Sequence, residues 1–71
     1  IYLMGGMFMV VKLARIKNGL TQEELARKAH IAKSKLISVE KGCYDNLKFK
    51  EMKLLAKILG STIEELFLGD D

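Results

Sequence analysis

Side chains that could contact a polyanion gather in one short stretch, AKSKLISVEK, which covers residues 32–41. With about 100° of rotation per residue, a helix over this stretch turns Leu36 and Val39 to one side. Small side chains on the opposite side would allow a close approach, and cations there would meet phosphate groups. A solvated amphipathic helix would look the same, so the stretch alone leaves both interpretations open. The opposite face comprises Ser34, Ile37, Ser38 and Lys41, with Lys33 and Lys35 on its flanks, and it has no Asp or Glu.

No other set of residues suggests catalysis or metal binding. Cys43 and His30 are the single Cys and the single His of the chain, which is too few for a zinc site. No nucleophile has the supporting base and acid that catalysis requires. We therefore expect no catalytic residues, no metal and no cofactor, and a protein that is not an enzyme. A lone cysteine excludes an internal disulfide and is typical of the reducing cytoplasm.

Charge is distributed unevenly along the chain. Residues 1–57 contain all twelve Lys and Arg residues and five of the nine acidic residues, which gives +7. Residues 58–71 contain the other four acidic residues and no Lys or Arg, which gives −4. A basic body predicts a polyanionic partner, although a solvated surface would give the same balance. The uncharged first eleven residues are too short to cross a bilayer and lack the basic start of a secretory signal. We expect no membrane contact, and the natural first residue stays open because residue 1 is Ile.

Short helices are predicted on both sides of the polar face. Capping boxes start at Thr21 and Thr62, where a Glu follows three residues later. Gly19, Gly42 and Gly60 mark helix ends. Pro is absent, and Val, Ile and Thr form no alternating runs, which favours helices over strands. The predicted helices cover about 7–18, 22–29, 32–41 and 48–59, with a short fifth helix around 63–67, and together they indicate one compact all-α domain.

The predicted fourth helix carries more apolar residues than one core face needs. Leu54 and Ile58 fall beside its core stripe, and Leu68 follows the last predicted helix. Surplus apolar surface predicts a homodimer built from the last two helices, with the apolar start of the chain as a further candidate surface. A wide core stripe would account for the same residues. The predicted stripe itself comprises Phe49, Met52, Leu55, Ala56 and Leu59.

The stretch from about Val10 to Phe67 resembles the Cro/phage-repressor helix-turn-helix family, also called the xenobiotic-response-element family. The matching residues are GLTQEELARKAHIAKSKLISVEKG, residues 19–42, followed by LAKILGSTIEELF, residues 55–67. The resemblance implies a compact five-helix bundle in which helices two and three form the helix-turn-helix. Helix three, about Ala32–Lys41, would then enter the major groove of DNA. The implied layout is an apolar extension over 1–9, the DNA-binding domain over 10–68 and an acidic tail over 69–71.

The resemblance also implies roles for individual residues. Gln22 at the start of helix two would bond a phosphate, helped by the helix N-terminus, although it could be an ordinary surface Gln. Ile37 could pack on a thymine methyl or cover a neighbouring helix. Arg15 and Glu40 match a structural pair, and the position of Glu40 near the buried edge supports this because a partly buried carboxylate needs a cation. The implied base contacts are Lys33, Ser34, Ile37 and Ser38, and the implied phosphate contacts are Gln22, Lys35 and Lys41.

Three positions depart from the family pattern. His30 occupies a turn position where the family usually has Gly, so it must tolerate a positive φ. It could contact phosphate, sense pH, or serve only as a turn residue. Ala32 replaces a capping Ser or Thr, so helix three lacks a side-chain cap. The loop CYDNLK, residues 43–48, is about one residue longer than usual and lacks its Pro.

From the resemblance we expect a sequence-specific, double-stranded DNA-binding transcriptional regulator in a bacterial cytoplasm. We expect a repressor that binds a palindromic operator as a homodimer and takes no small-molecule ligand. The alternative is an antitoxin-like or other protein-interaction module with the same fold. An RNA binder is disfavoured because the basic face has no aromatic residues for base stacking. The operator and the regulated genes are not encoded in this pattern.

Overall fold

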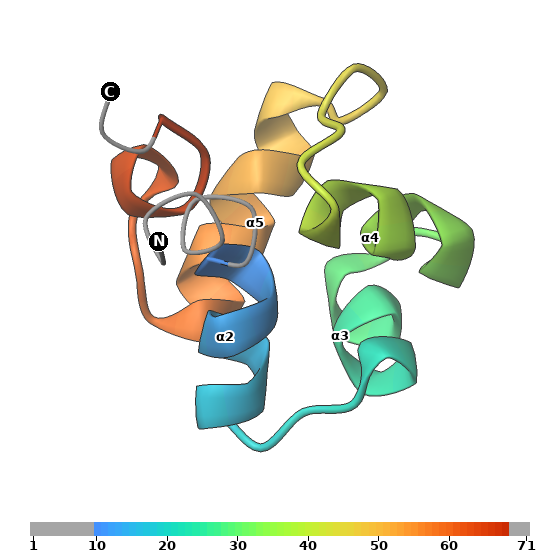
Figure 1. Cartoon of the computed structure of the whole chain (residues 1–71), viewed down its shortest axis with the longest axis vertical. Coiled ribbons are helices and arrows are strands. Elements are labelled where there is room, and N and C mark those ends of the chain that lie inside the picture. Colours follow the sequence, from blue (N-terminus) through green and yellow to red (C-terminus); the bar gives the residue numbers. More distant parts are fainter. Residues whose placement is uncertain (1–9, 69–71) are drawn as a thin grey trace.

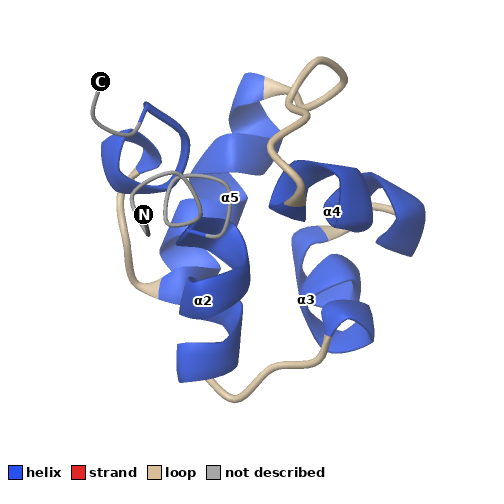
Figure 2. Cartoon of the chain, in the orientation of Figure 1, coloured by secondary structure: helices blue, strands red, loops and turns tan. Residues whose placement is uncertain are grey.

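A computed structural model describes residues 10–68 of the 71-residue chain. Every regular element in that range is a helix, which confirms the all-α prediction (Figure 2). The predicted start of the first helix before residue 10 lies outside the described residues. None of the helices within 10–68 has the length and apolar character needed to cross a bilayer. The elements are α2 (Val10–Lys17), α3 (Gln22–Ala29), α4 (Lys33–Glu40), α5 (Phe49–Leu59) and η1 (Glu64–Leu68), a short π-helix.

Capping hydrogen bonds fix where α3 and η1 begin. The Glu24 amide donates to the Thr21 hydroxyl oxygen at 3.0 Å, and the Glu24 carboxylate accepts from the Thr21 amide at 2.8 Å. Only one of the two hydrogen bonds of the second predicted capping box is present. The Glu65 amide donates to the Thr62 hydroxyl at 3.1 Å, but the Glu65 carboxylate accepts from the Ser61 hydroxyl at 2.7 Å. The Ser61 hydroxyl therefore takes the place of the Thr62 amide as the donor to the Glu65 carboxylate.

The turn between α3 and α4 depends on a left-handed residue. His30 has φ 58° and ψ 41°, and its amide donates to the Arg27 carbonyl at 3.2 Å. The Ile31 amide donates to the Ala26 carbonyl at 3.0 Å, which closes the helix end in the manner of a Schellman motif. The expected positive φ is confirmed. This turn carries the chain directly from α3 into α4.

The core is shared by the helices, with α2, α5 and η1 on one side and α3 and α4 on the other (Figure 1). Its largest fully buried side chains are Val11, Leu25, Leu36, Val39 and Leu55. Burying each such side chain contributes about 1.5–3 kcal/mol before the entropy cost of ordering it. Tyr44 and Phe67 add an edge-to-face contact with ring centroids 5.2 Å apart. Each helix therefore contributes one apolar face to a single core.

Phe49 was predicted in the core stripe of the fourth helix, and this is wrong. Its side chain is 64% exposed, and the Lys53 ammonium lies 5.4 Å from the ring centroid. Phe49 is the first residue of α5 and stands at the edge of the apolar stripe. Leu47, from the preceding loop, is buried instead and takes part in the core. The remaining stripe residues, Met52, Leu55, Ala56 and Leu59, are buried or half-buried against the core.

Candidate nucleic-acid interface

The two faces of α4 differ sharply in exposure. Leu36, Val39 and Glu40 are buried, whereas Ile37 is half-buried at the boundary between the faces. The other face is exposed and carries no carboxylate. Cations and hydroxyls there can meet an anionic partner without competition from acids on the same face. The exposed residues are Lys33, Ser34, Ser38 and Lys41.

A buried ion pair fixes the C-terminal end of α4 to α2. The Arg15 Nε donates to Glu40 Oε2 at 2.6 Å, and Arg15 Nη2 donates to Glu40 Oε1 at 3.4 Å. Arg15 Nη1 also donates to the Leu20 carbonyl at 2.9 Å. The two side chains are 11% and 5% exposed, so the charges are largely removed from water. This is the pair that the family resemblance implies, and breaking it would leave one buried charge uncompensated.

Gln22 joins the same cluster from the first position of α3. Its Nε2 donates to Glu40 Oε1 at 3.0 Å. A side-chain amide has two N–H donors, and this bond uses one of them. The other donor, together with the free amides at the start of α3, can serve a phosphate oxygen. The phosphate contact of Gln22 stays a prediction.

Lys35 ties α4 to α5, which sequence reasoning did not anticipate. Its Nζ lies 2.8 Å from Glu51 Oε1, and the same oxygen accepts from the Lys48 amide at 2.9 Å. The Lys35 ammonium, followed by the Lys48 amide, holds the pKa of Glu51 below its ordinary value. Glu51 is therefore a functional candidate that was missed. Its place three residues after Lys48, at the start of a predicted helix, was the available signal.

Two further lysines, Lys33 in α4 and Lys41 directly after it, are loosely held. Lys33 Nζ lies 3.5 Å from Glu23 Oε2, and the two side chains are 48% and 72% exposed. An exposed pair of this kind contributes up to about 1 kcal/mol, so DNA can displace it. Lys41 is exposed and makes no ion pair within residues 10–68. Both ammonium groups are free to move to a partner.

A hollow of about 360 Å³ extends the polar surface of α4 toward the following loop. The Cys43 amide donates to the Ser38 carbonyl at 2.9 Å, which holds the loop against the helix. Sequence reasoning did not select any loop residue as a binding residue. The loop contributes Cys43, Asp45, Asn46 and Leu47 to the hollow, and α4 contributes Ser34, Lys35, Ser38 and Val39.

The α3–turn–α4 unit, with its left-handed turn residue and exposed second helix, is the arrangement of a helix-turn-helix. A family model described as helix-turn-helix, of the Cro/C1 type, matches residues 11–66. The chain belongs to this family. The helix-turn-helix of this protein thus consists of α3, the turn at His30 and α4. Within residues 10–68 no three His, Cys, Asp or Glu side chains are grouped so that they could hold a metal ion.

Similar curated proteins come from two archaea. An uncharacterized HTH-type transcriptional regulator from Methanocaldococcus jannaschii is 39% identical over 64 residues, covering 86% of this chain and 91% of the relative. Another from Archaeoglobus fulgidus is 39% identical over 57 residues, covering 80% of each chain. A third, also from Archaeoglobus fulgidus, is 33% identical over 61 residues, covering 86% of this chain and 84% of the relative. No solved structure shows a significant match. These relatives give no support to the expected bacterial source.

Proposed function

We propose that this helix-turn-helix protein is a sequence-specific, double-stranded DNA-binding transcriptional regulator that acts in the cytoplasm and inserts α4 into the major groove. The observation that carries the proposal is the exposed, acid-free face of a helix whose opposite face is buried and anchored by Glu40. In helix-turn-helix proteins the second helix of the unit enters the major groove and the first crosses the backbone. The names of the archaeal relatives agree with this role.

Sequence is read by the first turns of α4. Lys33 donates to the O6 and N7 acceptors of guanine, and the Ser34 and Ser38 hydroxyls accept from or donate to base edges. Ile37, half-buried at the rim of this face, packs on a thymine methyl group. Serine bonds to most bases, so the two serines restrict the operator less than Lys33 does.

Phosphates are bound around these residues. Lys41 is exposed and neutralises a phosphate directly. Lys35 has three N–H donors, so it bonds a phosphate oxygen with one donor while another stays on Glu51. Gln22 does the same with its second N–H while the first holds Glu40. The Lys35–Glu51 ion pair and the Gln22–Glu40 hydrogen bond therefore orient two of the groups that meet the DNA backbone.

Two copies bind one palindromic operator. The eight residues of α4 reach only a few base pairs, so one copy cannot specify a site. A two-fold dimer places two α4 helices about 34 Å apart, one turn of DNA. We expect repression, because occupying an operator is sufficient for it and needs no further contact.

Selection of duplexes from a random pool tests this function. The selected duplex should bind at least about 10³-fold more tightly than random duplex, and its two halves should be related by a two-fold axis. Ser34→Glu should abolish binding, because the added carboxylate faces the phosphates. Lys17→Gln is the matched control, since it lowers the net charge equally at an exposed position on α2. A pool that stays random after selection, or equal affinity for single-stranded RNA, would contradict the proposal.

A further inference from the structure

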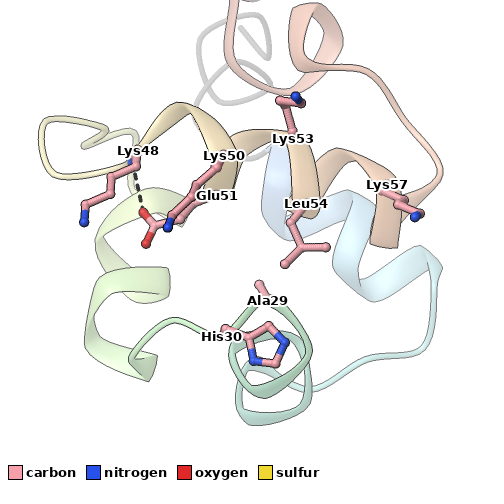
Figure 3. A pocket seen from close by; sticks show the side chains of 8 residues that line it. All are labelled: Ala29, His30, Lys48, Lys50, Glu51, Lys53, Leu54 and Lys57. Atoms are coloured by element: carbon pink, nitrogen blue, oxygen red, sulfur yellow. Dashed lines mark hydrogen bonds between the residues drawn. The ribbon is translucent and has the colours of Figure 1, made fainter.

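A groove of about 660 Å³ lies between α5 and the C-terminal end of α3. Leu54 points from α5 toward Ala29 and His30, so the floor of the groove is apolar (Figure 3). No residue of the exposed α4 face lines the groove. The lining residues are Ala29, His30, Lys48, Lys50, Glu51, Lys53, Leu54 and Lys57.

The rim of this groove is strongly basic. It carries Lys48, Lys50, Lys53 and Lys57, and none of them forms an ion pair with another side chain in the described part of the chain. The one carboxylate of the lining, Glu51, is already engaged by Lys35. The Lys53 ammonium lies over the Phe49 ring, so Lys48, Lys50 and Lys57 are the charges beside the apolar floor. These like charges favour an occupant that brings both acids and an apolar side chain.

The chain itself carries such a surface on η1. Glu64 and Glu65 are exposed, and Leu68 is 63% exposed on the same short helix. Residues 58–71 contain no Lys or Arg that would offset these acids. The acids of η1 and the lysines of α5 are thus opposite in sign, and each surface has an exposed or half-exposed leucine, Leu68 and Leu54.

We propose that the groove of one copy binds η1 of a second copy, and that the second copy returns the same contact across a two-fold axis. Leu68 packs on the half-buried Leu54 beside His30, while Glu64 meets the lysines of the rim. Two-fold symmetry makes the two contacts identical. Both grooves and both acidic helices are then occupied, so the assembly stops at two copies. The proposal names the interface of the dimer in the proposed function and rests on that dimer. A DNA backbone would satisfy the lysines but would not use the apolar floor.

Sedimentation equilibrium of the full chain without DNA tests the contact through charge reversal. Lys50→Glu and Glu64→Lys should each raise the dimer dissociation constant by about tenfold or more at low salt, because every dimer contains two reversed contacts. Lys50 lies in the first turn of α5, where a carboxylate suits the helix dipole, so the fold is retained. The double variant, with Lys50→Glu and Glu64→Lys together, has the two charges exchanged and should dimerise like the original chain. Mixing the two single variants should also restore dimers.

Lys17→Glu on α2 serves as the matched control and should leave the dimer unchanged. A dimer unaffected by Lys50→Glu, or a double variant that stays as weak as the single ones, overturns the proposed interface while leaving a dimer in place. If Lys50→Glu instead weakens binding to a DNA half-site and leaves self-association unchanged, the groove holds phosphates and the proposal is wrong. If the original chain is monomeric at high micromolar concentration, both the proposed interface and the dimer of the proposed function are wrong. Binding of α4 to a DNA half-site is measured separately, so this result would leave the DNA-binding proposal to its own test.

Discussion

The Lys35 ammonium lies 2.8 Å from the Glu51 carboxylate, so an ion pair joins the candidate recognition helix to the start of α5. The two side chains are only 25% and 15% exposed. Glu51 also accepts the Lys48 amide, which caps α5. The Glu51 carboxylate therefore orders the beginning of α5 and positions α4, and a change at Glu51 reaches the candidate DNA-binding face through Lys35.

A matched pair of substitutions separates the two roles of Lys35. Lys35→Ala should lose the tie to α5 and should also lower the salt slope of DNA binding by about one unit, because a phosphate contact is gone. Glu51→Gln should loosen the tie and leave the salt slope unchanged. Binding isotherms at several salt concentrations measure both. Equal salt slopes for Lys35→Ala and the original chain would mean that Lys35 only positions α4.

Acid should destabilise the domain through Glu51 and Glu24. Lys35 and the Lys48 amide lower the pKa of Glu51 from 4.5, and hydrogen bonds with the Thr21 amide and hydroxyl lower that of Glu24. A lowered folded-state pKa gives stability that is present above the unfolded value and lost as pH falls through the folded value. Urea midpoints should therefore fall as the pH drops below 4.5, and Glu51→Gln should remove part of this dependence. Asp45→Asn, at an exposed position of the loop between α4 and α5, is the control that should keep it.

Lys33→Ala should weaken binding to the operator alone. Loss of a base contact costs about 1–3 kcal/mol on the specific site and leaves random duplex almost unchanged. The comparison is Lys41→Ala, which removes a phosphate contact and should weaken both duplexes alike. Fluorescence anisotropy with the selected and a random duplex measures the four affinities. If Lys33→Ala affects the two duplexes equally, Lys33 is a phosphate contact and not a base contact.

Arg15→Ala should destabilise the fold without a DNA-specific effect. It leaves Glu40 buried beside Gln22 with no cation, at a cost of about 1–3 kcal/mol. Arg15→Ala combined with Glu40→Gln should recover part of this loss, because the uncompensated charge is gone. Thermal unfolding gives the comparison with Lys17→Ala, an exposed substitution on the same helix. A melting temperature for Arg15→Ala close to that of Lys17→Ala would show that the pair contributes little.

The helices were predictable because their ends carry local signals. Thr21 with Glu24 begins α3, and Gly60 with φ 67° ends α5, so these bounds follow from residues a few positions apart. The buried face of α4 follows from helical spacing. The Arg15–Glu40 pair joins residues 25 positions apart. Helical spacing indicated that Glu40 needs a cation, but only the family resemblance named Arg15 as that cation.

The contacts that were missed depend on how helices meet. Lys35 and Glu51 are brought together by the angle between α4 and α5, which spacing within one helix does not encode. Phe49 has the helical spacing of the buried residues of α5, but Leu47 from the preceding loop is buried in its place. Neither outcome is fixed by the periodicity of a single segment.

The separation of the two faces of α4 bears on how such a protein can change during evolution. Leu36, Val39 and Glu40 carry the packing of this helix and its buried ion pair with Arg15, whereas Ser34 and Ser38 are exposed. Substitutions at exposed positions usually change stability by less than about 0.5 kcal/mol. New operator preferences can therefore arise by replacing the serines one at a time, while the scaffold that presents them folds as before.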